Sequence, residues 1–289
     1  MITLFPEPCL SPLANAPHDA NAILTASRPI ERVRDYVSFS ALSLYQKCSL
    51  RYFFRYVAQL PEGSVSASLV FGRAIHRAIE HHFKELLEGN APPDLDTLLA
   101  EFDVGWNETP AEQITFPKTE TRDSLATLAG RVLVAFRDSD VSQPRGHILG
   151  IEEELRGQVL DGAPDLLARL DLLMETEGTL TVTDFKTAKS AWSSDQASDS
   201  AEQLLLYSEL VRQRFPGLPI RLEFVVFTKA KKVAISRYTV PLDVARVIRT
   251  KRIAQRVWRA ISAGHFIPSP SPMNCNGCPY RAPCRQWSG

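Results

Sequence analysis

A chain of 289 residues, 44% hydrophobic and 23% charged, has enough apolar material for one large domain or two closely joined ones. No segment is apolar and long enough to cross a membrane, and the first ten residues lack the pattern of a secretory signal peptide. The formal net charge is zero, so overall charge does not indicate a nucleic-acid partner, and five cysteines in so long a chain favour a reducing cytoplasm and metal-type cysteine chemistry over disulfides.

The first half of the chain is predicted to be helical. Residues 1–37 are rich in proline and alanine and are expected to form a loosely ordered lead. Residues 38–140 form a helical portion, in which apolar spacing predicts four helices. These helices cover residues 40–60, 71–87, 94–106 and 121–136.

The second half of the chain changes to a strand pattern. Strands rich in Ile, Leu, Val and Thr are predicted over 148–160, 166–174, 179–185, 220–228 and 233–238, and helices over 201–215 and 242–262. Three strands, a helix and two strands predict an α/β core over residues 141–264, with the earlier helices packed around it. A proline-rich tail with three cysteines, residues 265–289, follows the last helix.

Two aspartates are predicted to meet on neighbouring strands. Glu177 and Gly178 form a turn signal between two strand segments. If these two residues make the hairpin loop, opposite residues have numbers that sum to 355, and Asp171 faces Asp184 with Cβ atoms about 5 Å apart. Lys186 shares a strand face with Asp184, because side chains alternate along a strand.

This arrangement of charges predicts a cation site. Two ionised carboxylates about 5 Å apart repel by about 3 kcal/mol at an effective dielectric of ~20, so they need a cation or a shared proton. A hard ion such as Mg²⁺ or Mn²⁺ would satisfy them, and it would activate a bound water against a phosphodiester. The alternative is an ordinary solvated strand end. Against this alternative, all three charges have apolar neighbours in the sequence, namely Leu170, Leu172, Val182 and Phe185. Charges in apolar surroundings lower stability, so a functional reason for them is expected.

The segment Leu170–Asp171, followed by Asp184–Phe185–Lys186–Thr187, resembles the motif of PD-(D/E)XK nucleases in their RecB-like form. Ala168 stands where the family usually has glycine, and Leu170 replaces the nominal proline. The resemblance implies a restriction-endonuclease-like core, with a central mixed sheet flanked by helices. It also implies a metal-dependent DNA nuclease, an exonuclease or flap-type enzyme.

Two further segments resemble family motifs in order and spacing. The segment ending at His76, Phe71–Gly72–Arg73–Ala74–Ile75–His76, resembles a helix with a metal-ligating histidine, and Gln203–Leu204–Leu205–Leu206–Tyr207 resembles the Gln-x-x-x-Tyr motif. The resemblance implies one or two Mg²⁺ or Mn²⁺ ions held by His76, Asp171, Asp184 and the Phe185 carbonyl. The implied catalytic set is Asp171, Asp184, Lys186, Gln203 and Tyr207. The alternatives are a helix-face histidine at position 76, a capping box between Ser200 and Gln203, and Tyr207 as core filler.

Three cysteines lie close together in the tail, at positions 275, 278 and 284, among prolines that favour loop over helix. The best fourth ligand is Cys48, and Cys9 competes with it. The pattern resembles the iron–sulfur clamp of AddB-type and CRISPR-associated RecB-like nucleases, which implies a structural [4Fe–4S] cluster held by Cys48, Cys275, Cys278 and Cys284. Four thiolates suit Zn²⁺ equally well, and spacing does not choose between the two.

Basic residues gather near the end of the chain. Residues 228–260 hold ten Lys or Arg residues and one acid, Asp243, whereas residues 84–123 are acidic. The helix over 242–262 places Arg246, Arg249, Arg256 and Arg259 at helical spacing, with Arg252 near the line. We expect this face to hold a phosphate backbone with little base specificity, and the alternative is a solvated helix face.

The implied partners are DNA, single-stranded or with single-stranded ends, and a helicase or a CRISPR or recombination protein; DNA repair is another setting that fits. Two rival functions stay open. One is a DNA-binding or scaffolding module without catalysis on the same fold, and the other is a zinc-binding structural protein without a nuclease site.

Overall fold

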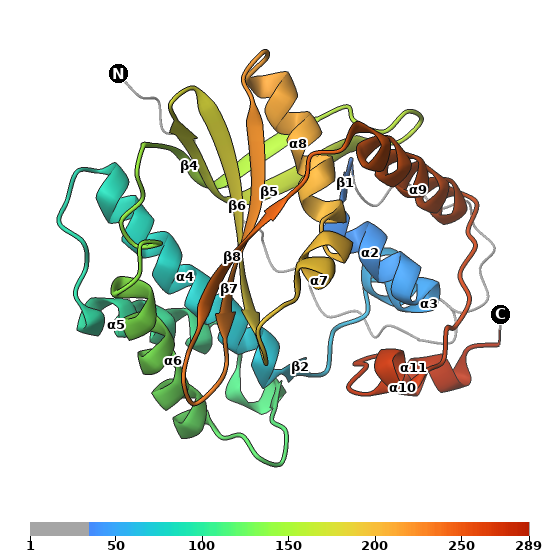
Figure 1. Cartoon of the computed structure of the whole chain (residues 1–289). Helices are drawn as coiled ribbons and strands as arrows, with labels where there is room; N and C mark the ends of the chain where they lie inside the picture. Colours follow the sequence, from blue (N-terminus) through green and yellow to red (C-terminus); the bar gives the residue numbers. More distant parts are fainter. Residues whose placement is uncertain (1–34, 289) are drawn as a thin grey trace, which may run out of the picture.

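The structure, a computed structural model, describes residues 35–288 (Figure 1). Most of the predicted N-terminal lead, and Cys9 with it, lies outside the described residues. Within them, a central sheet separates two groups of helices (Figure 1). No helix in this part of the chain is long and apolar enough to cross a membrane.

The central sheet is mixed and has the strand order β1-β5-β6-β7-β8, with β4 also paired to β5. The strands are β1 (Tyr36–Ser38), β4 (His147–Gly157), β5 (Asp165–Thr176), β6 (Thr179–Ala188), β7 (Ile220–Thr228) and β8 (Ile235–Val240). The pairs β1–β5 and β6–β7 are parallel, and the other pairs are antiparallel. Two short parallel strands, β2 (Val65–Ser66) and β3 (Ile114–Thr115), form a second small sheet.

Three helices cover one face of the sheet. They are α4 (Ala67–Leu87), α5 (Leu95–Asn107) and α6 (Arg122–Arg137). Side-chain oxygens of Ser66, Asp94 and Thr121 accept hydrogen bonds from the first turns of α4, α5 and α6 respectively, which explains why the helices begin there. Their apolar sides bury Phe185 and Phe227 of the sheet in one core cluster. This cluster holds α4 firmly against the strands that carry the predicted site.

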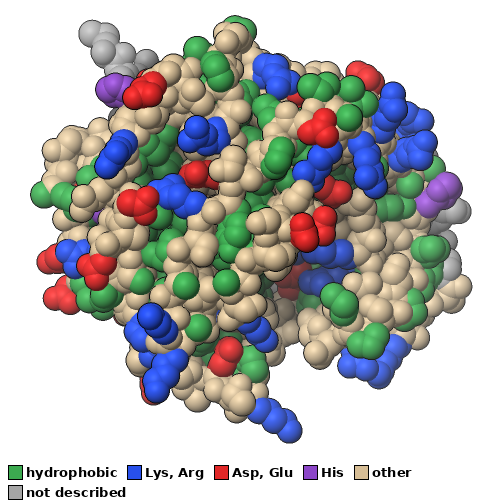
Figure 2. Space-filling view, viewed as in Figure 1, with side chains coloured by type: hydrophobic (Ala, Val, Ile, Leu, Met, Phe, Trp, Pro, Cys, Tyr) green, Lys and Arg blue, Asp and Glu red, His purple; other side chains and the backbone are tan. Residues whose placement is uncertain are grey.

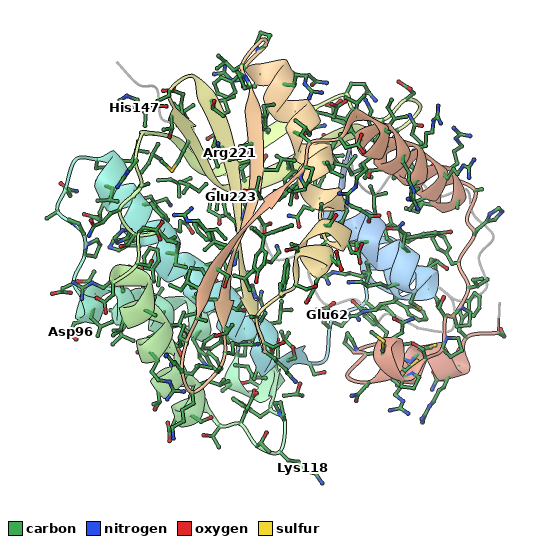
Figure 3. All side chains as sticks on the ribbon, viewed as in Figure 1. Glu62, Asp96, Lys118, His147, Arg221 and Glu223 are labelled. Atoms are coloured by element: carbon green, nitrogen blue, oxygen red, sulfur yellow. The ribbon has the colours of Figure 1, made fainter. Side chains whose placement is uncertain are left out.

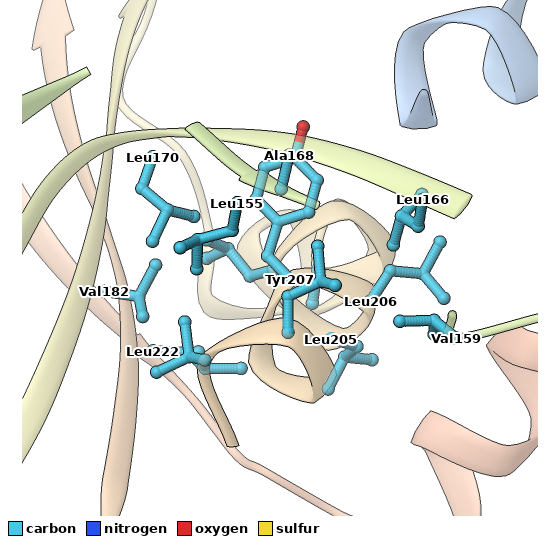
Figure 4. Packing of buried hydrophobic residues seen from close by; sticks show 14 of the residues in the cluster. Leu155, Val159, Leu166, Ala168, Leu170, Val182, Leu205, Leu206, Tyr207 and Leu222 are labelled. Carbon is cyan, nitrogen blue, oxygen red and sulfur yellow. The ribbon is translucent and has the colours of Figure 1, made fainter. Parts of the chain in front are cut away.

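The other face of the sheet is covered by α2 (Phe39–Lys47), α7 (Ser194–Asp199), α8 (Glu202–Arg214) and α9 (Val244–Ser262). Leu204, Leu206 and Tyr207 of α8 pack against Ala168 and Leu170 of β5 (Figure 4). The fold is therefore α/β, with a central mixed sheet flanked by helices on both sides, as predicted.

Several boundaries differ from the predictions. The helix predicted over 40–60 is interrupted at Cys48, and α3 (Ser49–Tyr52) and a π-helical turn, η1 (Phe53–Val57), follow it. The tail, predicted as loop, contains the short helices α10 (Pro272–Cys275) and α11 (Arg281–Gln286). A 3-10 turn, η2 (Ala111–Gln113), precedes β3. Local tertiary contacts decide these boundaries, which apolar spacing does not reveal.

Candidate active site

The β5–β6 hairpin has the predicted register. Leu172 pairs with Thr183 and Leu173 with Val182, so paired residue numbers sum to 355. Glu177 and Gly178 have φ angles of 51° and 75°, the left-handed values that a two-residue type I′ turn requires. The turn type therefore fixes this register, whose last pair, Leu172–Thr183, lies one residue short of Asp171 and Asp184.

Strand β5 is open on one side at Asp171. On that side β5 pairs with β1 as far as Leu167 and with β6 from Leu172, so residues 168–171 pair with neither strand. In place of a ladder hydrogen bond, the Phe185 N–H donates to Oδ2 of Asp171 over 2.7 Å. This bond ties the two motif segments together and leaves the carboxylate next to an opening in the sheet.

A third carboxylate, which the sequence analysis missed, comes from β4. Ile151 pairs with Leu172 and Glu153 with Leu170, so Glu152 lies between them, opposite Asp171. Its φ is 49°, a left-handed value that costs a non-glycine residue about 1–3 kcal/mol and is often found at functional sites. A signal was present in the three consecutive glutamates, 152–154, on a predicted strand, but the β4–β5 register was not predictable from the long connection between the strands.

The helix α4 supplies a histidine to the same place. His76 Nδ1 lies 3.5 Å from Asp171 Oδ2. Ligand atoms of His76, Glu152 and Asp171 all lie within 4.8 Å of one another, the spacing expected around a single ion. Gly72, one turn earlier on α4, faces β6, where a Cβ would lie 3.4 Å from Thr187 Oγ1, an ordinary contact distance.

The acids at this site are held in an unusual electrostatic state. Burial, with a further contribution from the Asp184 charge, raises the pKa of Asp171 to about 8. Burial and the Asp171 charge raise the pKa of Glu152 to about 7. Burial also lowers the pKa of His76, so its imidazole is a neutral electron donor at neutral pH. The carboxyls cannot all carry a charge unless a cation lies among them.

Asp184 and Lys186 form the other half of the site. Lys186 Nζ lies 2.5 Å from Oδ2 of Asp184, whose side chain is only 6% exposed. The same Oδ2 is buried and accepts no hydrogen bond of normal geometry. By contrast Glu223 (labelled in Figure 3), a buried acid on β7, accepts hydrogen bonds from both Thr183 and Arg237. Glu223 thus accepts two side-chain hydrogen bonds, whereas the only charged partner of Asp184 among the described residues is the Lys186 ammonium.

The donor set fits a hard divalent metal ion. Carboxylate oxygens and one neutral imidazole are ligands that Mg²⁺ or Mn²⁺ accepts. His76, Glu152 and Asp171 line a cleft of about 620 Å³ together with Lys186 and Arg73, whereas Asp184 does not line it. A larger cavity, about 960 Å³, lies beside β1 and η1 and is lined by none of these residues.

Gln203 and Tyr207 lie beneath the site rather than in its cleft. Gln203 Nε2 donates to Tyr207 Oη over 3.3 Å, and Tyr207 is 7% exposed within the core that packs on β5. Burial, with smaller contributions from the charges of Asp184 and Asp171, raises the pKa of Tyr207 to about 12. The capping box between Ser200 and Gln203 is wrong, because α8 begins after Ala201 without a side-chain cap.

The structure brings the four predicted cysteines together. The first helix ends at Cys48, whose backbone is extended, with φ −162°. The C-terminal tail contacts the residues on either side of Cys48. Ile267 N–H donates to Ser49 Oγ over 2.8 Å, and Asn274 Nδ2 donates to the Lys47 carbonyl over 2.8 Å. Cys48, Cys278 and Cys284 pack against the same small cluster of buried residues, and burial, together with the charges of the other three thiols, raises the pKa of Cys284. All four are free thiols.

The model for the PD-(D/E)XK nuclease superfamily matches residues 36–285 of the chain. The chain belongs to the PD-(D/E)XK nuclease superfamily. The match contains the four elements that carry His76, Glu152, Asp171 and Asp184. As a member of this superfamily, the protein is a phosphodiesterase that acts on nucleic acid, and such nucleases generally use divalent metal ions.

A solved structure shares the fold of this PD-(D/E)XK nuclease. A protein from Eubacterium rectale, described as a "putative exonuclease", is 14% identical with a TM-score of 0.56, over 94% of this chain and 91% of the other. The protein SSO0001 is 15% identical with a TM-score of 0.36, over 86% of this chain and 97% of the other, and that likeness carries no argument. Comparison with curated proteins gives no match.

Proposed function

We propose that this nuclease is a metal-dependent DNA exonuclease. His76, Asp171 and Asp184 would hold one or two Mg²⁺ or Mn²⁺ ions, with the Phe185 carbonyl and Glu152 as further ligands. The observation that carries the proposal is the group of His76, Glu152 and Asp171 ligand atoms, which lie within 4.8 Å of one another. The description of the Eubacterium rectale protein supports exonuclease activity.

The chain's own residues would do the following in the reaction. A bound divalent ion would supply Lewis-acid polarisation of the phosphodiester and a water of lowered pKa. Asp184 holds the Lys186 ammonium beside the cleft, where it would orient the attacking water and stabilise the charge that develops on phosphorus. Gln203 and Tyr207 would act by positioning β5 from below, because neither lines the cleft.

A structural [4Fe–4S] cluster bound by Cys48, Cys275, Cys278 and Cys284 is the second part of the proposal. The resemblance of the four-cysteine pattern to iron–sulfur nucleases supports a cluster over a single Zn²⁺, and Cys48, Cys278 and Cys284 pack on the same small group of buried residues. The cluster would close a loop of over two hundred residues. The bonds between the cysteines and the cluster would offset the entropy that the chain loses when this loop closes. Zinc is the alternative, and iron and zinc analysis of anaerobically purified protein decides between them.

The branch and biological setting belong to the proposal as well. The four-cysteine pattern supports the RecB-like branch, with AddB-like and CRISPR-associated nucleases as the families of similar design. The substrate would be single-stranded DNA or DNA with single-stranded ends, and the protein would act in the cytoplasm. It would take part in DNA repair, recombination or CRISPR adaptation, together with a helicase or a similar partner.

Digestion of labelled DNA tests the function. The parent protein with Mg²⁺ or Mn²⁺ is expected to degrade linear DNA, to spare covalently closed circles, and to stop in EDTA. Asp184→Asn should lose the activity, whereas Glu153→Gln, at the exposed next position on β4, should keep it. Metal-independent digestion, or full activity of Asp184→Asn, would contradict the proposal. Binding of DNA without any digestion would favour the non-catalytic module instead.

A further inference from the structure

Four arginines form a stripe on the outer side of α9. Arg249, Arg252, Arg256 and Arg259 are all exposed, and at 3.6 residues per turn they lie within an arc of about 80°. The buried residues of α9 lie on the opposite side of the helix: Val247, Thr250, Ala254 and Ile261. Figure 2 shows basic side chains gathered over α9, at the upper right of the view. We call the four residues the α9 arginine stripe.

The stripe differs from the other basic residues of the same helix. Arg246 donates to the Ser198 carbonyl over 2.6 Å and to Ser198 Oγ over 2.9 Å, and Lys251 Nζ lies 2.8 Å from Glu209 Oε2. These two side chains connect α9 to α7 and α8. Arg246, predicted from spacing to belong to the exposed line, therefore does not, and Arg252 takes its place.

The four guanidinium groups of the stripe have no internal partner. Across residues 35–288, the ion pairs, hydrogen bonds and ring contacts of the structure include none from these four side chains. The acids nearby are already engaged: Asp161 accepts from Gln255, Glu209 pairs with Lys251 and Arg212, and Asp243 caps the helix. Four positive charges thus face solvent along roughly 15 Å of helix.

We propose that the α9 arginine stripe binds the phosphate backbone of the nucleic-acid substrate, as a contact surface separate from the catalytic cleft. The inference rests on the proposed function, since it takes DNA as the substrate. Guanidinium groups bind phosphate oxygens in a two-pronged geometry, and contacts to phosphates carry no sequence information, so the surface would hold a strand without selecting its sequence. A bilayer is a poorer occupant, because the apolar side of α9 is packed against the core.

Salt-dependent binding measures this contact. Full-length protein in EDTA, so that DNA stays intact, is titrated against a fluorescent 30-nucleotide single strand by anisotropy at several KCl concentrations. The stripe variant carries Arg249→Gln, Arg252→Gln, Arg256→Gln and Arg259→Gln. Each phosphate contact on a single strand contributes about 0.7 to the slope of log affinity against log salt, so four lost contacts should reduce the slope by roughly 3 and raise Kd at least about tenfold at 0.1 M salt.

A charge-matched variant is the control. Lys118→Gln, Arg131→Gln, Arg145→Gln and Arg221→Gln remove the same charge from exposed positions on other elements, and Lys118 and Arg221 (labelled in Figure 3) lie away from α9. This control should keep parental affinity and slope. Replacing the stripe with four lysines should keep most of the slope. If the fourfold glutamine variant does not fold, two double variants replace it, Arg249→Gln/Arg256→Gln and Arg252→Gln/Arg259→Gln. Each should reduce the slope by about half as much as the loss of all four arginines.

Each result decides between the two proposals. Equal binding by the stripe variant and the control overturns the stripe, even if the parent digests DNA. Stripe-dependent binding by a parent that does not digest DNA leaves the stripe standing and overturns the exonuclease. Stripe-dependent binding to phosphatidylserine vesicles, with DNA binding unchanged, also overturns the inference.

Discussion

At the scale of single residues, the protein contains two kinds of acidic side chain: one that is satisfied by hydrogen bonds, and others whose pKa values are raised by burial. Glu223 accepts hydrogen bonds from Thr183 and Arg237 and needs nothing further. Glu152 and Asp171 have pKa values raised to about 7 and about 8 by burial, and Glu152 keeps a left-handed backbone. Backbone strain and the burial of acids both destabilise a fold, and both are typical of functional sites. A cation bound between these acids would account for their presence here.

Glu152→Gln tests the ligand that the sequence analysis missed. The variant removes one carboxylate from the group around His76 and Asp171 and keeps nearly the same shape. Even indirect supporting groups at metal sites change affinity by about 10–100-fold, so Kd for Mn²⁺ should rise at least about tenfold in calorimetric titration. Glu153→Gln is the control and should bind Mn²⁺ like the parent. Unchanged Mn²⁺ affinity in Glu152→Gln would remove this residue from the site.

His82 predicts a pH dependence of stability away from the site. Its Nε2 lies 2.8 Å from the Ser142 carbonyl, and its Nδ1 is buried without a partner, so burial lowers its pKa below 6.5. Below pH 6.5, His82 therefore binds a proton more readily in the unfolded chain than in the folded chain. The free energy of unfolding accordingly falls as pH drops below 6.5. Urea unfolding in EDTA between pH 7 and 5 should show a steeper fall for the parent than for His82→Leu, by up to about 1.4 kcal/mol per pH unit. Equal slopes would contradict this assignment.

At the scale of elements, the β5–β6 hairpin decides the geometry of the site. A one-residue slip would turn Asp171 or Asp184 to the other face, and the two-residue turn prevents it. The side of β5 between Leu167 and Leu172 is left open where β1 stops and β6 begins. The motif aspartate thus lies at an opening that the pairing of three strands creates.

Gly178→Val tests the importance of the turn. Gly178 has a φ of 75°, with no atom near its absent Cβ, so the change adds backbone strain rather than a clash. A β-branched residue in the left-handed region should lower the free energy of unfolding by about 1–2 kcal/mol. Gly130→Ala on α6, also in open space but in ordinary helical backbone, should instead raise stability slightly. A stable Gly178→Val variant would show that the core, not the turn, holds the register.

How much of the site was predictable depended on the length of each connection. The two-residue turn allowed the β5–β6 register to be predicted by counting, whereas the seven residues between β4 and β5 left the β4–β5 register open. The cysteines were found by spacing, but the break in the first helix at Cys48 depends on the returning tail. Likewise the direction of Arg246 depends on Ser198, a residue on another helix.

At the scale of the whole molecule, the two ends of the described chain meet at the cysteines. The tail after α9 contacts the region around Cys48 through Tyr45, Ser49 and Asn274, and Tyr280 is buried with Phe54. Few apolar residues form this third core cluster, so its stability would depend on the group that the thiols bind.

Cys278→Ala tests this dependence. The variant should lose the brown colour of an iron–sulfur cluster after anaerobic purification and should melt at a lower temperature. Met273→Ala, in the same tail and 93% exposed, should keep both colour and melting temperature. A Cys278→Ala protein that stays brown and equally stable would contradict the clamp, and a colourless parent with stoichiometric zinc would replace the cluster by zinc.

The most direct test of the central claim is the anomalous diffraction of a crystal soaked in Mn²⁺. The account predicts an anomalous peak at bonding distance, roughly 2.0–2.3 Å, from carboxylate oxygens of Asp171 and Asp184 and close to His76 Nδ1. A crystal that binds Mn²⁺ elsewhere, or whose residues 171 and 184 point to opposite faces of the sheet, would contradict it.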